Sequence, residues 1–209
     1  DGYVTSADLA DPNFSKSTYG DVKVGDLKYR DMNGDGFIDS RDETFIGLSD
    51  IPENTYSLTL GATYKGWGFN VMFQGVDHVS RYYDAEAMYE FVNGGKVKSL
   101  HMGRWNPNMS EEWNLANATY PLLHYDSFGN HNHQQNSFFL KNGAFLRLKN
   151  IELSYSLPMQ WIKHLAMSEC RLFVNANNLI TWDHLDDLVD PESSGSNKYP
   201  IMKTVNFGV

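Results

Sequence analysis

The stretch that decides the fold reads Tyr56-Ser57-Leu58-Thr59-Leu60-Gly61-Ala62-Thr63-Tyr64, and a Lys65-Gly66 pair joins it to Trp67-Gly68-Phe69-Asn70-Val71-Met72-Phe73-Gln74. In both halves nearly every second residue is apolar, and the residues between them are mostly polar or small. A repeat of two residues indicates a β-strand with one apolar face, and the two-residue interruption indicates a tight turn. Residues 56–75 are therefore predicted to form a β-hairpin.

The same alternation returns at residues 150–157, 170–177 and 204–209. Upstream of Asn150 the apolar residues Ala144, Leu146 and Leu148 have the opposite parity, so the phase slips near Lys149. Such a slip predicts a bulge within one long strand. Short helices are expected at residues 84–92 and 158–167. The sequence thus predicts an all-β protein of antiparallel strands with short helical inserts.

The connections between these strands alternate in length. Lys65-Gly66 and residues 158–169 are short, whereas residues 77–137 and 183–203 are long. Loops of that length are usually functional. Short turns at one end and long loops at the other are typical of transmembrane β-barrels, as are aromatic belts at both interfaces. An aromatic content of 14 % suits such belts.

Composition excludes several classes of protein. The net charge of −9 comes without a basic stripe, so nucleic acid is not an expected partner. The single cysteine, Cys170, excludes an internal disulfide, and we interpret it as a buried or lipid-facing apolar residue. No apolar run approaches the ~18 residues that a transmembrane helix needs.

The sharpest motif is Asp31-Met32-Asn33-Gly34-Asp35-Gly36-Phe37-Ile38-Asp39-Ser40-Arg41-Asp42. Oxygen-bearing side chains stand at loop positions 1, 3, 5, 9 and 12 of an EF-hand-like loop, with a glycine at the sharp turn. The predicted Ca²⁺ ligands are Asp31, Asn33, Asp35, the Phe37 carbonyl, Asp39 and Asp42. EF-hands prefer glutamate at the last position, and long flanking helices are missing, so the sequence predicts one structural loop outside an EF-hand domain.

Other polar clusters are interpreted without a catalytic role. His124, His131 and His133 lie in the long loop, where we expect solvated side chains in preference to a zinc site. No phosphate-binding glycine loop and no nucleophile elbow is present. The chain is therefore predicted not to be an enzyme.

Several short motifs, in this order, carry a resemblance to a known family. They are residues 25–36 (Gly-Asp-Leu-Lys-Tyr-Arg-Asp-Met-Asn-Gly-Asp-Gly), Ile46-Gly47, Tyr64-Lys65-Gly66-Trp67, Phe73-Gln74-Gly75, Trp105-Asn106-Pro107-Asn108, Tyr120-Pro121, Phe145-Leu146-Arg147-Leu148-Lys149-Asn150-Ile151, Leu157-Pro158 and Asn177-Asn178-Leu179-Ile180-Thr181-Trp182. This order resembles the C-terminal part of the SusC/RagA-like TonB-dependent outer-membrane transporters of Bacteroidetes, over nearly all of residues 25–209.

The resemblance implies the C-terminal section of a large transmembrane β-barrel, with a SusD-like lipoprotein lid, energy from TonB, and oligosaccharide or peptide cargo. It divides the chain into an unplaced extracellular segment (1–24), the calcium loop (25–50) and barrel strands (51–209), whose loops 77–137 and 183–203 are extracellular. Five strands do not close a barrel, so we expect a part of a larger protein.

Two other functions remain open at this point. One is a soluble calcium-dependent carbohydrate-binding module, a β-sandwich with Trp105 and Trp113 as sugar platforms. The other is a hydrolase accessory domain with a dockerin-like loop, which predicts a second copy of the loop that the sequence lacks. For the transporter, the candidate ligand-binding residues facing the lumen are Asn70 and Gln74, with Asn175 and Asn177 in a later strand.

Overall fold

The computed structural model describes residues 2–83, 88–125, 130–165, 167–185, 189–193 and 199–209. The chain forms two compact units: Asp1–Ile46 with Asp84–Phe139 (unit 1), and Gly47–Tyr83 with Leu140–Val209 (unit 2). Most of the long loop 77–137 belongs to unit 1, together with the N-terminal segment.

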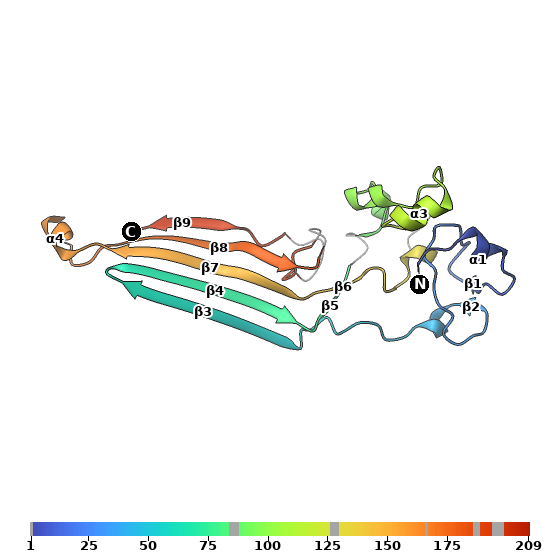
Figure 1. The fold of residues 1–209 in the computed structure, drawn as a ribbon, viewed down its shortest axis with the longest axis horizontal. Helices are drawn as coiled ribbons and strands as arrows, with labels where there is room; N and C mark the ends of the chain where they lie inside the picture. The colour runs from blue at the N-terminus through green and yellow to red at the C-terminus, as the bar shows by residue number, and fades with distance from the viewer. Residues whose placement is uncertain (1, 84–87, 126–129, 166, 186–188, 194–198) are drawn as a thin grey trace. The chain divides into compact units, whose positions relative to one another are not determined.

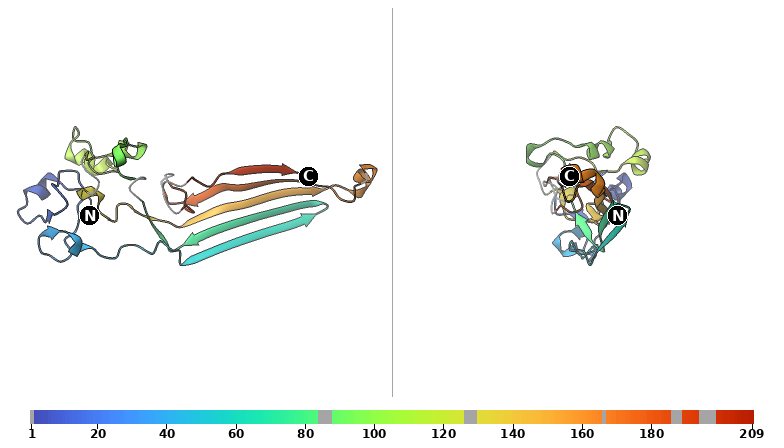
Figure 2. Two further views of the ribbon diagram at one scale, coloured as in Figure 1. Left: turned by 180° about the vertical axis from the view of Figure 1, so that it is seen from behind. Right: turned by 90° about the vertical axis from the view of Figure 1, so that its left-hand side faces the viewer.

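Unit 2 is built on one five-stranded antiparallel sheet. Its strands are β3 (Asn54–Tyr64), β4 (Trp67–Asp77), β7 (Phe145–Ser156), β8 (Arg171–Asp183) and β9 (Thr204–Gly208), in the order β3-β4-β7-β8-β9. The strands lie side by side in a single open layer (Figures 1 and 2). All five strands predicted from the alternation are confirmed. The described fold is mostly β and its main sheet is antiparallel, as expected.

The predicted hairpin closes through the Lys65-Gly66 pair. Tyr64 pairs directly with Trp67, and both turn residues have positive φ, +48° at Lys65 and +87° at Gly66. Two consecutive positive φ angles define a type I′ turn, whose twist matches that of the strands it joins. Glycine suits the second position because a Cβ there would lie 3.0 Å from the Ser156 carbonyl oxygen.

The predicted bulge lies at Lys149. The register between β4 and β7 shifts between Met72 and Phe73, and that between β7 and β8 shifts between Leu148 and Asn150. One extra residue in β7 reverses the parity of its side chains. The bulge therefore keeps Leu146 and Leu148 on the same face as Ile151 and Leu153.

The short helices agree with the sequence in one place and differ in another. Residues 158–167 contain α4 (Met159–Ile162) and η5 (Lys163–Leu165), as expected. Of the helix expected at 84–92, residues 84–87 lie outside the described residues, and Tyr89–Phe91 are not helical. Met88 is helical, but the expected continuation over Tyr89–Phe91 is wrong, because Phe91 has a left-handed backbone conformation with φ of +54°. None of the helices among the described residues is long and apolar enough to cross a membrane.

Unit 1 consists of short elements around a compact core. They are α1 (Ser6–Ala10), β1 (Lys16–Ser17), β2 (Phe37–Ile38), η1 (Ser40–Asp42), η2 (Val92–Gly94), η3 (Ser99–Gly103), α3 (Glu111–Asn117) and η4 (His131–His133). The buried apolar residues include Val4, Leu27, Trp105, Tyr120 and Phe139. The remaining strands, β5 (Ser80–Tyr82) and β6 (Leu140–Asn142), pair with each other in unit 2.

Candidate functional site: a two-faced sheet and a polar loop unit

One face of the sheet is apolar across all five strands. A single row of paired residues runs from β3 to β9 through Leu60, Val71, Ile151, Ala176 and Val205. The neighbouring row contains Ala62, Phe69, Leu153, Val174 and Phe207. Leu58 and Leu60 are each more than half exposed, and Phe207 is 81 % exposed. Val71 and Ala176, in the middle strands of the first row, are buried, and the described part of unit 2 leaves most of the rest of this apolar face at least partly exposed.

Aromatic residues close the apolar face at both of its ends. Near the hairpin turn Tyr64, Trp67 and Tyr155 are paired neighbours, with the Trp67 and Tyr155 rings 4.8 Å apart between centroids. At the opposite ends of the strands lie Tyr56 and Trp182, both about half exposed. Aromatic rings with a polar edge suit the boundary between an apolar layer and water.

The opposite face is polar and forms its own cross-strand ladder. Asn70 pairs with Glu152, which pairs with Asn175, and the Asn206 side-chain amide donates to the Asn175 side chain at 2.9 Å. One row further, the Asn150 amide donates to Asn177 at 2.9 Å. The residues proposed to face a lumen, Asn70, Gln74, Asn175 and Asn177, therefore lie on one face. The alternation in the sequence was sufficient to find them.

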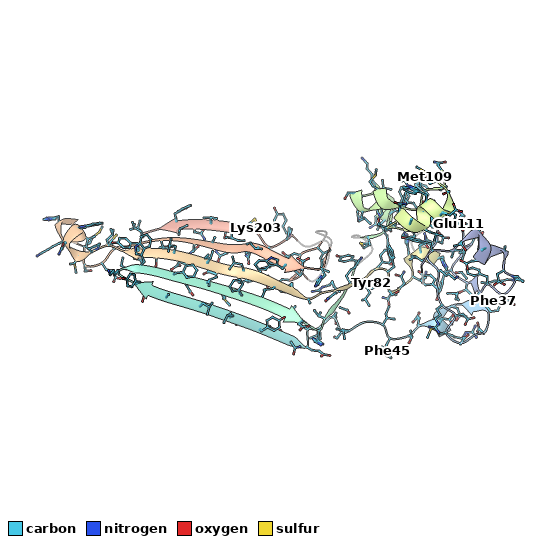
Figure 3. All side chains as sticks on the ribbon, viewed as in Figure 1. Phe37, Phe45, Tyr82, Met109, Glu111 and Lys203 are labelled. Carbon is cyan, nitrogen blue, oxygen red and sulfur yellow. The ribbon has the colours of Figure 1, made fainter. Side chains whose placement is uncertain are left out.

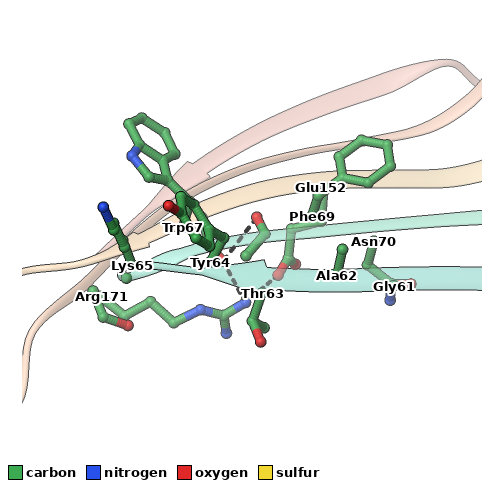
Figure 4. Close-up of a pocket in the computed structure, with 14 residues that line it drawn as sticks. Gly61, Ala62, Thr63, Tyr64, Lys65, Trp67, Phe69, Asn70, Glu152 and Arg171 are labelled. Atoms are coloured by element: carbon green, nitrogen blue, oxygen red, sulfur yellow. Dashed lines mark hydrogen bonds and ion pairs between the residues drawn. The ribbon is translucent and has the colours of Figure 1, made fainter.

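A shallow hollow of about 710 Å³ lies on the polar face near the hairpin turn (Figure 4). Gly61, Gly68 and Ser154 line the hollow with small or absent side chains. At Gly68 a larger residue is disfavoured, because a Cβ there would lie 2.7 Å from the Ser154 hydroxyl oxygen. Arg171 crosses the hollow to form an ion pair with Glu152 and also donates to the Ser154 hydroxyl at 3.1 Å. Glu152 is thus paired with Arg171, and Lys65 adds a second positive charge to the lining.

The calcium-loop residues form a tight turn in unit 1. Gly34 and Gly36 have positive φ, which lets the chain wrap around the Asp31 carboxylate. That carboxylate accepts from the Gly34 and Gly36 amides at 2.6 and 2.8 Å. The Asp42 carboxylate accepts from the Met32 and Asp39 amides, each at 2.9 Å, and so joins the two ends of the loop.

Arg41 forms ion pairs inside this loop. Its guanidinium lies 2.7 Å from both the Asp35 and the Asp39 carboxylates. The hydrogen bond from Arg41 is the main reason that the pKa of Asp39 is lowered, and the pKa of Asp31 is lowered mainly by the Gly36 amide. Among the described residues no group of three or more His, Cys, Asp or Glu side chains is arranged to hold a metal ion.

Buried histidines and carboxylates form the polar core of unit 1. His124 Nε2 lies 2.6 Å from the Asp26 carboxylate, and His133 Nε2 lies 3.2 Å from the Glu90 carboxylate. The His131 ring contacts the Leu27 carbonyl oxygen at 2.7 Å. The expectation that His124, His131 and His133 are solvated is therefore wrong, because each ring has a buried partner. No periodicity marks these contacts, so the sequence did not reveal them.

The proposed sugar platforms differ in exposure. Trp105 is only 3 % exposed, and its ring packs edge-on against Tyr3 with 5.5 Å between centroids. A buried ring cannot be a platform, so this proposal is wrong for Trp105. Trp113 on α3 is 45 % exposed and remains accessible. Cys170 is half-buried and forms no disulfide.

Known proteins indicate the class to which this chain is similar. No protein-family model matches the chain. The chain resembles a section of a SusC/RagA-like TonB-dependent transporter, as its motifs predicted. It is 24 % identical over 200 residues to TonB-dependent receptor P26 of Formosa agariphila, covering 89 % of this chain and 19 % of the receptor. It is 23 % identical over 201 residues to TonB-dependent receptor P3 of the same organism, covering 95 % of this chain and 18 % of the receptor.

Solved structures agree with these relatives. A chain of the RagAB peptide transporter matches with a TM-score of 0.60 and 27 % identity, over 79 % of this chain and 18 % of that chain. The RagAB peptide importer in its open-open state matches 97 % of this chain and 20 % of that chain, with a TM-score of 0.61 and 22 % identity, which supports the fold alone. The chain thus spans about a fifth of the length of the proteins it matches. These relatives are receptors and transporters, which is consistent with a protein that is not an enzyme.

Proposed function

We propose that this chain is a section of the wall of a TonB-dependent outer-membrane nutrient importer. The observation that carries the proposal is the row from Leu60 to Val205, because it makes one sheet face apolar across five strands while the other face is polar. In a barrel wall the apolar face contacts lipid and the polar face lines the lumen. Both outer strands, β3 and β9, would then pair with further strands, since lipid does not tolerate open sheet edges.

The partners belong to the same proposal. A peptide is the cargo of the RagAB transporter, which this chain resembles. For the importer containing this chain we propose oligosaccharide or peptide cargo, a SusD-like lipoprotein as lid, and TonB as the source of energy. Unit 1 would then lie on the extracellular side, where it could contact cargo and lid, with Trp113 accessible for contact.

The soluble carbohydrate-binding module explains the structure less well. A β-sandwich buries the inner faces of its two sheets against each other. In the described part of unit 2 no second sheet packs on the apolar face, and Leu58, Leu60 and Leu153 remain exposed. An uncovered apolar surface of this extent needs either a membrane or a partner.

Cysteine labelling of adjacent residues in β3 tests the importer. Leu58→Cys and Thr59→Cys are introduced in a Cys170→Ser background of the importer that contains this chain, in intact outer membranes. Thr59→Cys should react at least tenfold faster with a charged, water-soluble maleimide, because neighbouring side chains point to opposite faces. A lipid-soluble maleimide should label Leu58→Cys. Equal labelling of both positions by the charged reagent contradicts the proposal.

We also propose that the loop from Asp31 to Asp42 binds Ca²⁺. Its donor atoms are all oxygens, which a hard cation prefers, and Gly34 and Gly36 supply the sharp turns. The Asp35 and Asp39 carboxylates pair with Arg41 in this structure, so binding requires the guanidinium to move away. Bound calcium would neutralise the clustered carboxylates and stiffen the loop.

Calorimetric titration of the EGTA-treated importer tests the calcium proposal. A single extracellular loop of this type should bind with a dissociation constant of ~10⁻⁴–10⁻³ M. Arg41→Ala should bind several-fold more tightly because it removes the competing ion pair, whereas Arg30→Ala, an exposed control in the same unit, should behave like wild type. The triple variant Asp31→Ala, Asp35→Ala, Asp39→Ala should not bind. Equal heats for wild type and the triple variant would remove the calcium proposal.

A further inference from the structure

A charged cluster holds part of the connection between β8 and β9 against the sheet. Arg147 of β7 lies on the polar face, where it pairs with Gln74 and Thr181, and its side chain is only 2 % exposed. Its guanidinium donates to both oxygens of the Asp190 carboxylate at 2.9 Å and also to Glu192. Both bonds to Asp190 come from Nη2, whereas Nη1 bonds Glu192, so the planar guanidinium holds two carboxylates in different directions.

Neighbouring residues complete the anchor. Lys149, the bulge residue, donates to both oxygens of the Glu192 carboxylate at 2.8 Å. Arg81 of β5 donates to the Pro191 carbonyl oxygen at 3.0 Å. Two carboxylates and one carbonyl oxygen from three consecutive residues are therefore bound by three cationic side chains. Two of these come from β7 and one from β5. Pro191 adds stiffness, because proline restricts the backbone at this point.

The cluster is largely buried, with the Arg147, Asp190 and Glu192 side chains 2, 10 and 17 % exposed. Exposed ion pairs contribute little and do not hold a loop in one place, whereas removing one partner of a buried pair leaves a costly unpaired charge. Asp190 also accepts from the amides of Glu192 and Ile201, at 2.9 and 3.3 Å. Residues 189–193 are thus fixed on the polar face from several directions.

We propose that residues 189–193 form a fixed constriction over the lumen-facing side of the sheet, with Arg147 as the residue that positions it. This inference rests on the proposed importer function, because only then is the polar face a lumen. A segment held against the lumen-facing side reduces the open cross-section at that level. It would therefore limit the size of the solute that passes, and Arg147 would contribute to specificity without contacting cargo.

The test uses the importer that contains this chain and two independent measurements. The loosened variant is Asp190→Asn with Glu192→Gln, which keeps side-chain shape but removes the charges that bind Arg147. The control is Asp50→Asn with Glu53→Gln, which removes the same charge from two exposed residues of unit 2. Amide hydrogen exchange of residues 189–193 reports the anchor, and TonB-dependent uptake of peptides and oligosaccharides of increasing length reports the constriction.

The loosened variant should show at least tenfold faster exchange of residues 189–193 and uptake of longer cargo than the wild type accepts, and the control variant should show neither change. A second variant, Arg147→Met, should give the same pair of changes as the loosened variant. Unchanged exchange would overturn the anchor, and faster exchange with an unchanged size limit of uptake would overturn the constriction. If the wild-type protein lies outside the outer membrane or takes up no cargo, the importer function itself fails, whatever the exchange data report.

Discussion

Glu90 illustrates how single buried residues set the behaviour of unit 1. Its side chain is 1 % exposed and accepts from the Tyr120 hydroxyl at 2.9 Å and the His124 amide at 2.9 Å, and it lies beside His133. Burial acts to raise the pKa of this carboxyl, but the hydrogen bonds from His133 and His124 outweigh it and lower the pKa to about 2. The ionised form therefore belongs to the folded state.

His101 and His131 respond to pH in the same direction. Burial is the main cause that lowers the pKa of each imidazole. His101 accepts from the Lys98 amide through Nδ1, at 2.8 Å, and Nε2 lies 2.8 Å from the Met88 carbonyl oxygen. Only the neutral ring can satisfy both contacts, because a protonated ring has no acceptor. Protonation would therefore remove a buried hydrogen bond.

Unit 1 is accordingly expected to lose stability in acid. A group whose folded pKa is depressed stabilises the fold above its ordinary pKa and loses that contribution as pH falls. As pH falls, the contribution of the two histidines to stability should be lost first, below about pH 6.5. The contribution of Glu90 should be lost between its ordinary pKa of 4.5 and its folded pKa of about 2. The Glu90 contribution is on the order of 3 kcal/mol. Amide exchange of residues 101–125 as a function of pH measures this loss.

Glu90→Gln should weaken unit 1 at neutral pH and abolish the pH dependence between 4.5 and 2. Glu112→Gln, in the exposed first turn of α3, serves as the matched control and should change neither. Protection of residues 101–125 in the wild-type protein, measured as exchange relative to the unfolded chain at the same pH, that does not change with acid would contradict this account of the polar core.

At the scale of elements, the strands were predictable and the loop unit was not. A strand with one apolar face has alternating apolar and polar residues in its sequence. This alternation located β3 and β4, and the change of its parity located the bulge at Lys149. The polar core of unit 1 depends on contacts such as Asp26 with His124, which are 98 residues apart in sequence. Local patterns hold no information about such pairs.

The same reasoning explains the mixed outcome at the candidate site. The residues of the polar face follow from the period of two, and the close turns at Gly34 and Gly36 follow from the loop motif. The anchor around Arg147 was missed because its partners, Asp190 and Glu192, lie in an aperiodic segment. The burial of Trp105 was missed because a single aromatic residue in a loop carries no indication of what covers it.

At the scale of the whole molecule, the exposed apolar face dominates the expected solution behaviour. The face extends over five strands, and the outer edges of β3 and β9 present unpaired backbone groups. Apolar patches of more than a few hundred Å² and open sheet edges both promote association in water. Unit 1 buries a core of its own, and apolar side chains such as Phe45 and Met109 are exposed on it (Figure 3).

The 209-residue chain by itself should therefore aggregate in detergent-free buffer and be dispersed by detergent micelles that cover the apolar face. Size exclusion and circular dichroism in the two media measure this, and a variant with Leu58→Ser, Leu60→Ser and Phe207→Ser provides the comparison, since it removes three exposed apolar side chains while leaving the polar face intact. The variant should aggregate less in water and gain less from detergent. A folded, monodisperse wild-type monomer in plain calcium buffer would instead mean that the apolar face is covered within the chain, and the barrel-wall function would give way to the soluble binding module.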